Sequence, residues 1–224
     1  MSGAKFIVTI DGPSGAGKST ISRNLAARLG YRYLDTGAMY RAVGLKVQEE
    51  GVSLEDDASL DKLLAAVEIE LIADGGETRV LLDGKDVSGR IRTAEMGMVA
   101  SQVSANPGVR AKLTELQRQI GGQGSVVAEG RDMGTVVFPE AENKFFLDAS
   151  PEERARRRIE QLREKGHAVD EDEILRQIRK RDRDDSTRTH APLAAADDAI
   201  IVDSSYMSIE EVVSFMMNSI TGRS

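Results

Sequence analysis

One short stretch near the amino terminus limits what this chain can fold into. Residues 12–19 read Gly-Pro-Ser-Gly-Ala-Gly-Lys-Ser and fit the spacing G-x-x-x-x-G-K-[ST]. Glycines at this spacing let the backbone turn left-handed, so that successive N–H groups form a concave nest for phosphate oxygens. In such a loop Lys18 reaches the β- and γ-phosphates of a nucleotide, and the Ser19 hydroxyl can bind Mg²⁺.

The segments around this loop distinguish a phosphate site from an ordinary glycine-rich turn. Residues 6–10 form a short run rich in β-branched side chains, which predicts a strand buried on both faces. After the loop, Ile21, Leu25 and Leu29 recur every four residues before Gly30, which predicts a helix that ends there. A strand before the loop and a helix after it are the context that nucleotide phosphate binding requires.

The rest of the chain continues the alternation of strands and helices. Further buried strands are predicted at residues 31–35, 125–129, 144–148 and 199–203. Five strands alternating with helices indicate an α/β fold whose parallel sheet is covered on both faces. Residues 67–72 and 78–83 instead alternate across a Gly-Gly turn, and residues 85–87 can add a third strand. We therefore expect a small antiparallel insertion at about residues 67–90.

The composition narrows the class of protein. The chain has 224 residues, of which 40% are apolar and 30% charged, as in a globular protein of one domain with insertions or two small domains. No apolar run approaches the roughly 18 residues of a membrane span, and the first residues lead directly into a strand. We therefore expect no membrane partner, no signal peptide and a cytoplasmic location. The lack of cysteine excludes disulfides, and His167 and His190 lie too far apart in sequence to suggest a metal centre.

The charge distribution favours a small anionic ligand. A formal net charge of −7 argues against nonspecific binding of a nucleic-acid polymer. Residues 151–188, however, are nearly neutral because they are rich in arginine, and they predict two helices at 151–165 and 171–182. These arginines can belong to a mobile lid that closes over phosphates or to a solvated helical hairpin.

Several polar side chains follow predicted strands, where open α/β sheets bind their ligands. Asp35 or Thr36 can cap the helix after the second strand. Arg41 in the first turn of that helix opposes the helix dipole, and a phosphate bound there would explain it. Glu129 closes another apolar strand and can help to hold Mg²⁺ or its water shell.

Four further residues are ambiguous when taken alone. Arg131 and Asp132 can bind a ligand or form a structural ion pair. Ser101 and Arg110 flank a Pro-Gly break between predicted helices at 91–105 and 109–120. Without further context they are ordinary helix-surface residues.

Together these segments resemble the bacterial cytidylate kinases, a family of nucleoside monophosphate kinases, over nearly the whole chain. The resemblance is carried by residues 10–19, 33–41, 129–138 and 181–188, the last followed by Ala191-Pro192. It implies a P-loop core whose five parallel strands have the order 2-3-1-4-5. It divides the chain into a core (1–36, 121–150 and 189–224), a monophosphate-binding domain (about 37–120, including the insertion) and a helical lid (about 151–188).

The resemblance also implies the reaction and the residues that perform it. The γ-phosphoryl group of MgATP would pass to CMP or dCMP, giving ADP and CDP or dCDP in pyrimidine nucleotide metabolism. Catalysis is assigned to Lys18, Arg131 and Arg188. ATP binding is assigned to Gly12, Pro13, Ser14, Gly15, Ala16, Gly17, Lys18, Ser19, Thr20 and Arg157, with Ser19 as the metal ligand. No feature demands a protein partner, so a monomer is the default expectation.

The acceptor-binding residues fall into three groups under this resemblance. Ser101, Arg110 and Asp132 are assigned to the cytosine base, whose amino donor and two acceptors suit a carboxylate beside cationic and hydroxyl donors. Arg41, Arg131 and Arg188 are assigned to the acceptor phosphate, which guanidinium groups bind bidentately. Thr36, Arg181 and Asp185 are assigned to positioning the monophosphate, with Asp185 near the sugar.

Three residues depart from the pattern expected of these kinases. Thr36 stands where serine is expected and keeps the hydroxyl, whereas Glu129 stands where aspartate is expected, which puts a direct metal role in doubt. Ser19 replaces a glycine that some relatives carry, and this strengthens its assignment to Mg²⁺.

Other P-loop proteins remain alternatives. A related kinase could act on UMP or another acceptor, although shikimate-type kinases are shorter and would not need the insertion at residues 67–90. A GTPase-like switch or nucleotide-gated binding module would usually carry an Asn-Lys-x-Asp segment, which this sequence lacks.

Overall fold

The central sheet has the predicted topology. The computed structural model describes residues 6–74, 77–164 and 166–222. Its main sheet consists of β1 (Ile7–Asp11), β2 (Arg32–Asp35), β6 (Val126–Gly130), β7 (Asn143–Asp148) and β8 (Ile200–Asp203). These strands pair in parallel in the order β2-β6-β1-β7-β8, which is 2-3-1-4-5 when they alone are numbered. The expected fold class and strand order are therefore confirmed.

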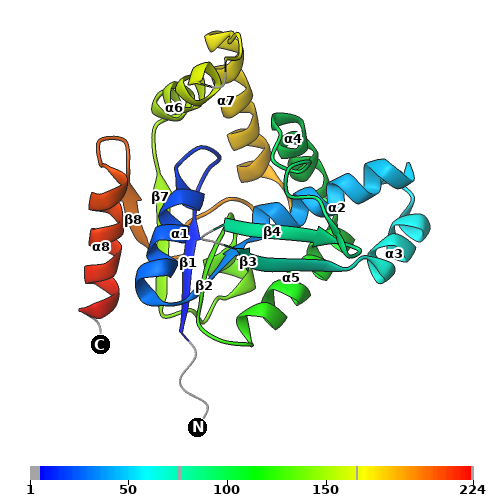
Figure 1. Cartoon of the computed structure of the whole chain (residues 1–224), viewed down its shortest axis with the longest axis horizontal. Helices are drawn as coiled ribbons and strands as arrows, with labels where there is room; N and C mark the ends of the chain where they lie inside the picture. The colour runs from blue at the N-terminus through cyan, green and yellow to red at the C-terminus, as the bar shows by residue number, and fades with distance from the viewer. Residues whose placement is uncertain (1–5, 75–76, 165, 223–224) are drawn as a thin grey trace.

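Helices cover both faces of this sheet (Figure 1). The α-helices of the described residues are α1 (Lys18–Leu29), α2 (Thr36–Glu50), α3 (Asp57–Ala66), α4 (Ala94–Val103), α5 (Pro107–Gly121), α6 (Pro151–Glu164), α7 (Glu171–Thr187) and α8 (Ile209–Thr221), of which α1, α8, α2 and α5 cover the sheet. On one face α1 and α8 pack over the sheet and bury Leu25 and Phe145 in one apolar cluster. On the other face α2 and α5 bury Leu34 and Leu113 in a second cluster. The two clusters hold the carboxyl ends of β1 and β6 at a fixed separation.

The antiparallel insertion is also present. It comprises β3 (Ile69–Asp74), β4 (Glu77–Leu82) and β5 (Lys85–Asp86), which form a separate sheet in the order β3-β4-β5. Both of its pairings are antiparallel. The Gly-Gly turn predicted between the first two strands falls on residues 75–76, which lie outside the described residues.

Two helices that follow the insertion begin at other residues than predicted, because side chains cap them. The α4 helix starts at Ala94 rather than residue 91 because the Thr93 hydroxyl accepts the Met96 N–H and caps it. The α5 helix starts at Pro107 because the Asn106 side chain accepts the N–H groups of the next turn. The Pro-Gly pair therefore opens α5, as proline at the first helical position favours, rather than separating two helices.

The α6–α7 hairpin rises above the carboxyl end of β1 and the loop that follows it (Figure 1). The α7 helix continues to Thr187, beyond the predicted end at about residue 182. Because the extra turn is polar, the spacing of apolar residues does not predict it. No glycine or proline stops the helix before Pro192. The extra turn brings Asp185 onto the same helix as Arg181, one turn apart.

A short π-helix follows β6 and was not predicted. This segment, η1 (Met133–Val137), contains a bond from the Phe138 N–H to the Met133 carbonyl at 2.7 Å. Arg118 of α5 donates to the carbonyls of Val136 and Val137, at 2.7 and 3.0 Å. It thus provides hydrogen-bond donors for the carbonyls at the C-terminal end of η1. Such single-turn π segments often occur at functional sites, and this one directly follows the predicted ligand residues.

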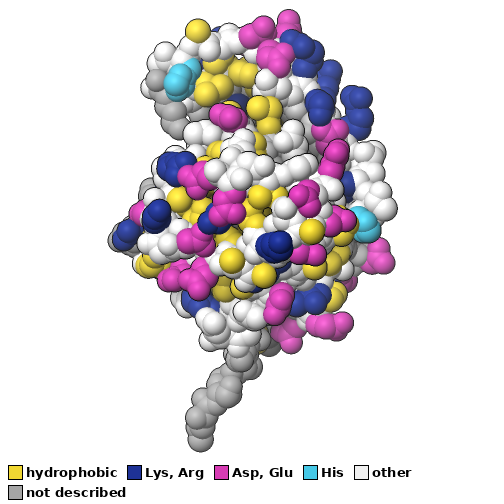
Figure 2. All heavy atoms as spheres, turned by 90° about the vertical axis from the view of Figure 1, so that its right-hand side faces the viewer, with side chains coloured by type: hydrophobic (Ala, Val, Ile, Leu, Met, Phe, Trp, Pro, Cys, Tyr) yellow, Lys and Arg dark blue, Asp and Glu magenta, His cyan; other side chains and the backbone are white. Residues whose placement is uncertain are grey.

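The described surface carries both charge signs. Figure 2 shows acidic and basic side chains interspersed over the face that holds the insertion, α2 and α5, so a polyanion would meet both signs there. Among the described residues, none of the helices has the length and apolarity needed to cross a bilayer.

Candidate active site

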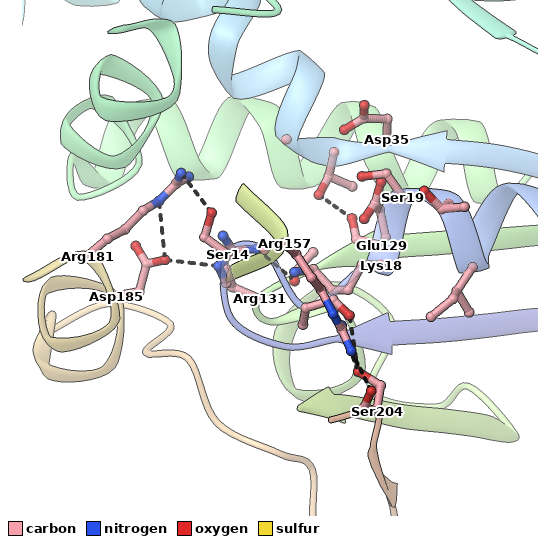
Figure 3. A pocket seen from close by; sticks show the side chains of 18 of the residues that line it. Ser14, Lys18, Ser19, Asp35, Glu129, Arg131, Arg157, Arg181, Asp185 and Ser204 are labelled. Atoms are coloured by element: carbon pink, nitrogen blue, oxygen red, sulfur yellow. Dashed lines mark hydrogen bonds and ion pairs between the residues drawn. The ribbon is translucent and has the colours of Figure 1, made fainter. Parts of the chain in front are cut away.

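A single cavity of about 830 Å³ brings the predicted residues together. It runs from the loop after β1, beneath the α6–α7 hairpin, to the ends of α2, α4 and β6 (Figure 3). All nine residues expected to bind the acceptor line it: Thr36, Arg41, Ser101, Arg110, Arg131, Asp132, Arg181, Asp185 and Arg188. Residues 14–20 and Arg157 line it as well. Gly12 and Pro13 act on the shape of the loop instead.

The loop after β1 has the backbone that a phosphate nest needs. Gly12, Gly15 and Gly17 all have positive φ angles, of 149°, 81° and 91°. A Cβ at Gly12 would lie 2.0 Å from the Leu147 carbonyl oxygen, so no other residue fits against β7 there. Gly17 directly precedes α1, whose first N–H groups therefore open toward the cavity.

Lys18 lies buried at the base of this nest. Its Nζ donates to the Pro13 carbonyl at 2.6 Å, which folds the side chain back over its own loop. Burial lowers the pKa of Lys18, and the nearby cation Arg131 lowers it further, while Glu129 opposes the shift. A bound anion would offset both the burial of the Lys18 charge and its repulsion by Arg131, as expected for a phosphate-binding lysine.

Glu129 is held at the end of β6 beside the start of α1. The Tyr33 hydroxyl donates to its carboxylate. Burial raises the pKa of Glu129 and the neighbouring Asp35 raises it further, whereas Lys18 and hydrogen bonds from Tyr33 and Ser19 oppose the change. The Ser19 hydroxyl is exposed on this side of the cavity (Figure 3).

At the opposite end of the cavity, Arg110 and Asp132 form a buried ion pair. Arg110 also donates to the Ser104 carbonyl at 3.2 Å, and its guanidinium lies 5.7 Å from the ring centre of Tyr40. Arg110 is therefore not an ordinary helix-surface cation, which corrects the interpretation that its position alone suggests. Asp132 pairs with Arg110 and Arg131 pairs with Asp185, so both residues form ion pairs, although not with each other.

Asp185 links α7 to two other parts of the site. Its carboxylate accepts from Arg131 Nε at 2.9 Å and from the Ser101 hydroxyl at 3.1 Å. Burial works to raise the Asp185 pKa, but the cations Arg131 and Arg181 outweigh it and the pKa is lowered. Asp185 is therefore ionised at neutral pH and orients the guanidinium groups around it.

Arginines converge on the space between the two ends of the cavity. Arg181 donates to the Ser14 hydroxyl at 3.0 Å, and burial together with Arg131 lowers its pKa to about 10 (Figure 3). Arg41 pairs with Asp35 at 3.2 Å, so its place in the first turn of α2 does not by itself require a phosphate. Even so, among the described arginines, three buried N–H groups have no partner at hydrogen-bond distance: Arg41 Nε, Arg181 Nε and Arg188 Nη2. Carboxylate oxygens lie only at ion-pair distance from the last two, 4.0 Å from Arg181 Nε and 3.8 Å from Arg188 Nη2. Unpartnered cationic donors of this kind suit a multivalent oxyanion.

The arginines of α6 play different parts. Arg154 is buried and binds Asp182 bidentately, at 3.0 and 2.6 Å, and it also donates to the carbonyls of Ser14 and Ala149. It therefore fixes the base of the hairpin to the loop rather than facing a ligand. Arg157 lines the cavity and donates to the Ser204 carbonyl at 2.5 Å (Figure 3). Arg156 is exposed and pairs with Glu153 and Glu160.

Comparisons with known proteins identify the family. The model of a family described as cytidylate kinase matches residues 8–222. Cytidylate kinases of Geobacter sp. strain M21 and of Carboxydothermus hydrogenoformans are each 50% identical to the chain. The first match covers 97% of this chain and 93% of the relative, and the second covers 95% and 96%. The chain belongs to the cytidylate kinase family.

A solved structure supports the fold of this cytidylate kinase family member independently of sequence. An uncharacterised protein from Eubacterium ventriosum superposes with a TM-score of 0.53 over 98% of this chain and 99% of that one, at 12% identity. At that identity the likeness concerns the fold alone.

Several residues of this cytidylate kinase site carry no role in the sequence-based prediction. Tyr40 and Ser104 support Arg110, and the Ser104 hydroxyl also accepts from Arg188 at 3.1 Å. Ser204 accepts from Arg157 at the other end of the cavity. Tyr40 falls inside one of the recognised motifs, so position could have suggested it. The two serines act through long-range contacts that no local pattern signals.

Proposed function

We propose that this chain transfers the γ-phosphoryl group of MgATP to CMP or dCMP, with the donor at the loop after β1 and the acceptor beneath α4 and α7. The assignment of one end of the cavity to the phosphate donor and the other to the acceptor rests on one observation. The cavity joins a phosphate nest with Lys18 to a buried Arg110–Asp132 pair, and three buried arginine N–H groups of its described residues make no hydrogen bond. A donor triphosphate and a base of defined polarity fit this distribution of charge.

The donor triphosphate is proposed to lie along residues 12–20. The glycine backbone and the start of α1 would hold its β- and γ-oxygens, and Lys18 would exchange the Pro13 carbonyl for a phosphate oxygen. Arg157 would flank the donor, since it lines the cavity next to Gly17.

The acceptor base is proposed to sit at Arg110 and Asp132. The Asp132 carboxylate would accept from the cytosine amino group, and Arg110 with Ser101 would donate to the two ring acceptors. Uracil carries an oxygen where cytosine carries its amine, so it would face the carboxylate unfavourably. The buried position of the pair makes this discrimination strong, because an unpaired buried charge is costly.

The acceptor phosphate is proposed to lie among Arg41, Arg131 and Arg188, with Thr36 and Arg181 positioning it and Asp185 near the sugar. Phosphoryl transfer asks mainly for in-line alignment and charge neutralisation. Lys18 and the arginines would supply both, and residues 151–188 would act as the lid that excludes water. In this proposal residues 37–120 hold the acceptor, and the remaining residues form the core.

Mg²⁺ is proposed to bind with the donor phosphates at Ser19. The residues fit, because Ser19 offers a hard oxygen in the cavity and Glu129 lies beside it, held by Tyr33. Mg²⁺ usually keeps several waters and binds through one or two protein groups plus phosphates, and it would neutralise the charge on the transferring group. Ser19→Ala should therefore raise the Mg²⁺ concentration needed for half-maximal binding of a fluorescent ATP analogue.

The reaction is tested by ADP formation from MgATP with CMP, dCMP, UMP, AMP or GMP, each beside a control without acceptor. Turnover restricted to CMP and dCMP is the expected result. Strong turnover with UMP would instead favour a related kinase. ADP formation that is equal without an acceptor would contradict the proposal and favour an ATPase or switch.

We also propose that the chain works as a monomer. All proposed ligand-binding residues come from one chain and line one cavity. Light scattering during size-exclusion chromatography tests this, and a mass of 24.3 kDa is expected.

A further inference from the structure

Asp11 occupies an unusual place for an acidic residue. It is the last residue of β1, is 3% exposed and directly precedes Gly12. One carboxylate oxygen accepts the N–H of Met133 and the other accepts the N–H of Gly134, both at 2.8 Å. These two N–H groups open the π-helix η1, where backbone donors have no partner within the helix.

The two residues just before these donors bind the acceptor in the proposal above. Asp132 is the residue that caps η1, and Arg131 precedes it. In the strand pairing, Asp11 of β1 lies opposite Gly130 of β6. Its carboxylate therefore links β1, which leads into the proposed ATP-binding loop, to the segment that carries Arg131 and Asp132. A buried carboxylate that satisfies two adjacent backbone donors fixes the position of that backbone.

We propose that Asp11 is a positioning residue that locks the Arg131–Asp132 loop to the strand bearing the donor loop, and so sets the geometry of acceptor recognition. This inference rests on the proposed acceptor roles of those two residues.

The charges around Asp11 make this lock dependent on pH. Burial raises the Asp11 pKa to about 7, Asp132 adds to the rise, and the two backbone hydrogen bonds and Lys18 oppose it. On the other flank, Lys144 of β7 pairs with Asp198 at 2.8 Å. The ionised form accepts both N–H groups, whereas protonation turns one oxygen into a donor. Acceptor discrimination should therefore weaken as the pH falls below about 7.

The test is Asp11→Asn, which keeps the size of the side chain but replaces one acceptor with an amide donor. The matched control is Thr9→Val on the same strand, because Thr9 is fully buried, its hydroxyl has no hydrogen-bond partner and valine has its shape. In Asp11→Asn we expect the KM for CMP to rise roughly tenfold and the CMP-to-UMP ratio of kcat/KM to fall roughly tenfold. The KM for ATP should change less, by about threefold at most.

The pH profile of the CMP-to-UMP ratio separates positioning from mere destabilisation. Both acceptors carry the same phosphate, so its own titration near pH 6 cancels in the ratio. The parent ratio should fall between about pH 8 and pH 6, and that of Asp11→Asn should stay flat. A CMP KM and ratio in Asp11→Asn that match Thr9→Val would overturn the proposal.

Two further variants keep the test decisive. Asp132→Ala is measured alongside: if it leaves the ratio unchanged, the acceptor assignment fails, and if it alone changes the ratio, only the role of Asp11 fails. Should Asp11→Asn not fold, Gly134→Ala replaces it. Its added Cβ would lie 3.1 Å from the Thr9 hydroxyl and 3.2 Å from the Lys144 side chain, so these side chains or the start of η1 must shift by a few tenths of an ångström. Unchanged acceptor kinetics in folded Gly134→Ala, together with a parent CMP-to-UMP ratio that is flat between about pH 8 and pH 6, would then overturn the proposal.

Discussion

Arg131 donates from Nε to Oδ2 of Asp185 at 2.9 Å, and this contact joins the end of β6 to the last turn of α7. The guanidinium that we assign to the acceptor phosphate thus already has an anionic partner on the α6–α7 hairpin. Burial lowers the pKa of Arg181, and repulsion from Arg131 across the same space lowers it further. Asp185 is the carboxylate that keeps these cations together.

Replacing Asp185 with alanine should disperse that cluster. We expect the KM for CMP to rise at least about tenfold, because Arg131 and Arg181 lose the carboxylate that orients them. Ser101→Ala removes the neutral partner of the same carboxylate and one proposed hydroxyl donor to the base, and it should cost less, about threefold. Steady-state kinetics with CMP and dCMP compare the two variants. Equal effects would mean that orientation of the arginines by Asp185 is unimportant.

Lys18→Ala should impair transfer to every acceptor. Its Nζ is the buried cation of the phosphate nest, and removing such a group costs roughly 100-fold or more in kcat. Lys46→Ala, which removes the ion pairs of Lys46 with Glu50 and Asp83, is the control and should retain activity. Rates of ADP formation with saturating CMP decide the matter, and a Lys18→Ala rate close to that of the control would refute the assignment.

Asp132→Ala should affect the base rather than the phosphates. It removes the proposed acceptor for the cytosine amine and leaves Arg110 buried without the carboxylate it pairs with. We expect kcat/KM for CMP to fall roughly 100-fold and the preference for CMP over UMP to fall roughly tenfold. The measurement is kcat/KM for both acceptors at one pH. An unchanged ratio would show that the carboxylate does not read the base.

Arg154→Ala should destabilise the fold. The buried guanidinium binds Asp182 and two backbone carbonyls, so its loss should lower the free energy of unfolding by about 2–4 kcal/mol. Arg156→Ala is a matched control two residues along the same helix, where exposed pairs with two glutamates contribute little. Urea unfolding compares the variants. Equal midpoints would mean that Arg154 does not anchor the hairpin.

The raised pKa of Asp11 predicts a pH dependence of stability with a definite sign. The folded pKa of about 7 exceeds the ordinary value of 3.8, so the folded state holds the proton more tightly than the unfolded state. The contribution that protonation of Asp11 makes to the free energy of unfolding is therefore fully present below about pH 4 and is lost as the pH rises through 7. Asp11→Asn lacks this titration.

Unfolding free energies of the parent and Asp11→Asn, measured from pH 5 to pH 8, test this sign. The unfolding free energy of the variant relative to that of the parent should rise by at most ~1.4 kcal/mol per pH unit up to about pH 7, and this difference should then level off. Other groups cancel in the difference between the two proteins. A difference that stays constant, or that falls with pH, would contradict the raised pKa.

The sequence was most informative where local pattern and motif agree. The strand, loop and helix around Lys18 follow from β-branched residues, glycine spacing and a four-residue apolar period, and the structure confirms them. The four other strands of the main sheet are confirmed for the same reason, because buried parallel strands read as short apolar runs. The family resemblance then gathered the acceptor residues, all of which line the cavity.

Features that depend on distant contacts were missed. The π-helix after β6 is stabilised from outside, by Asp11 at its start and Arg118 at its end. The resemblance singled out Arg157, which lines the cavity, but only the fold reveals that Arg154 in the same arginine-rich run anchors the hairpin. The last turn of α7 lacks an apolar period because its inward side chains, such as Asp185, are charged.

The α6–α7 hairpin is fixed at its base, and its tip lies at the end away from the loop after β1 (Figure 1). Arg154 anchors the base, whereas residues 166–170 form the outer tip, where His167 is exposed. The chain contains no cysteine. A single thiol introduced as His167→Cys would consequently be the sole attachment point for a fluorescent reporter, on an exposed residue of the hairpin that does not line the cavity.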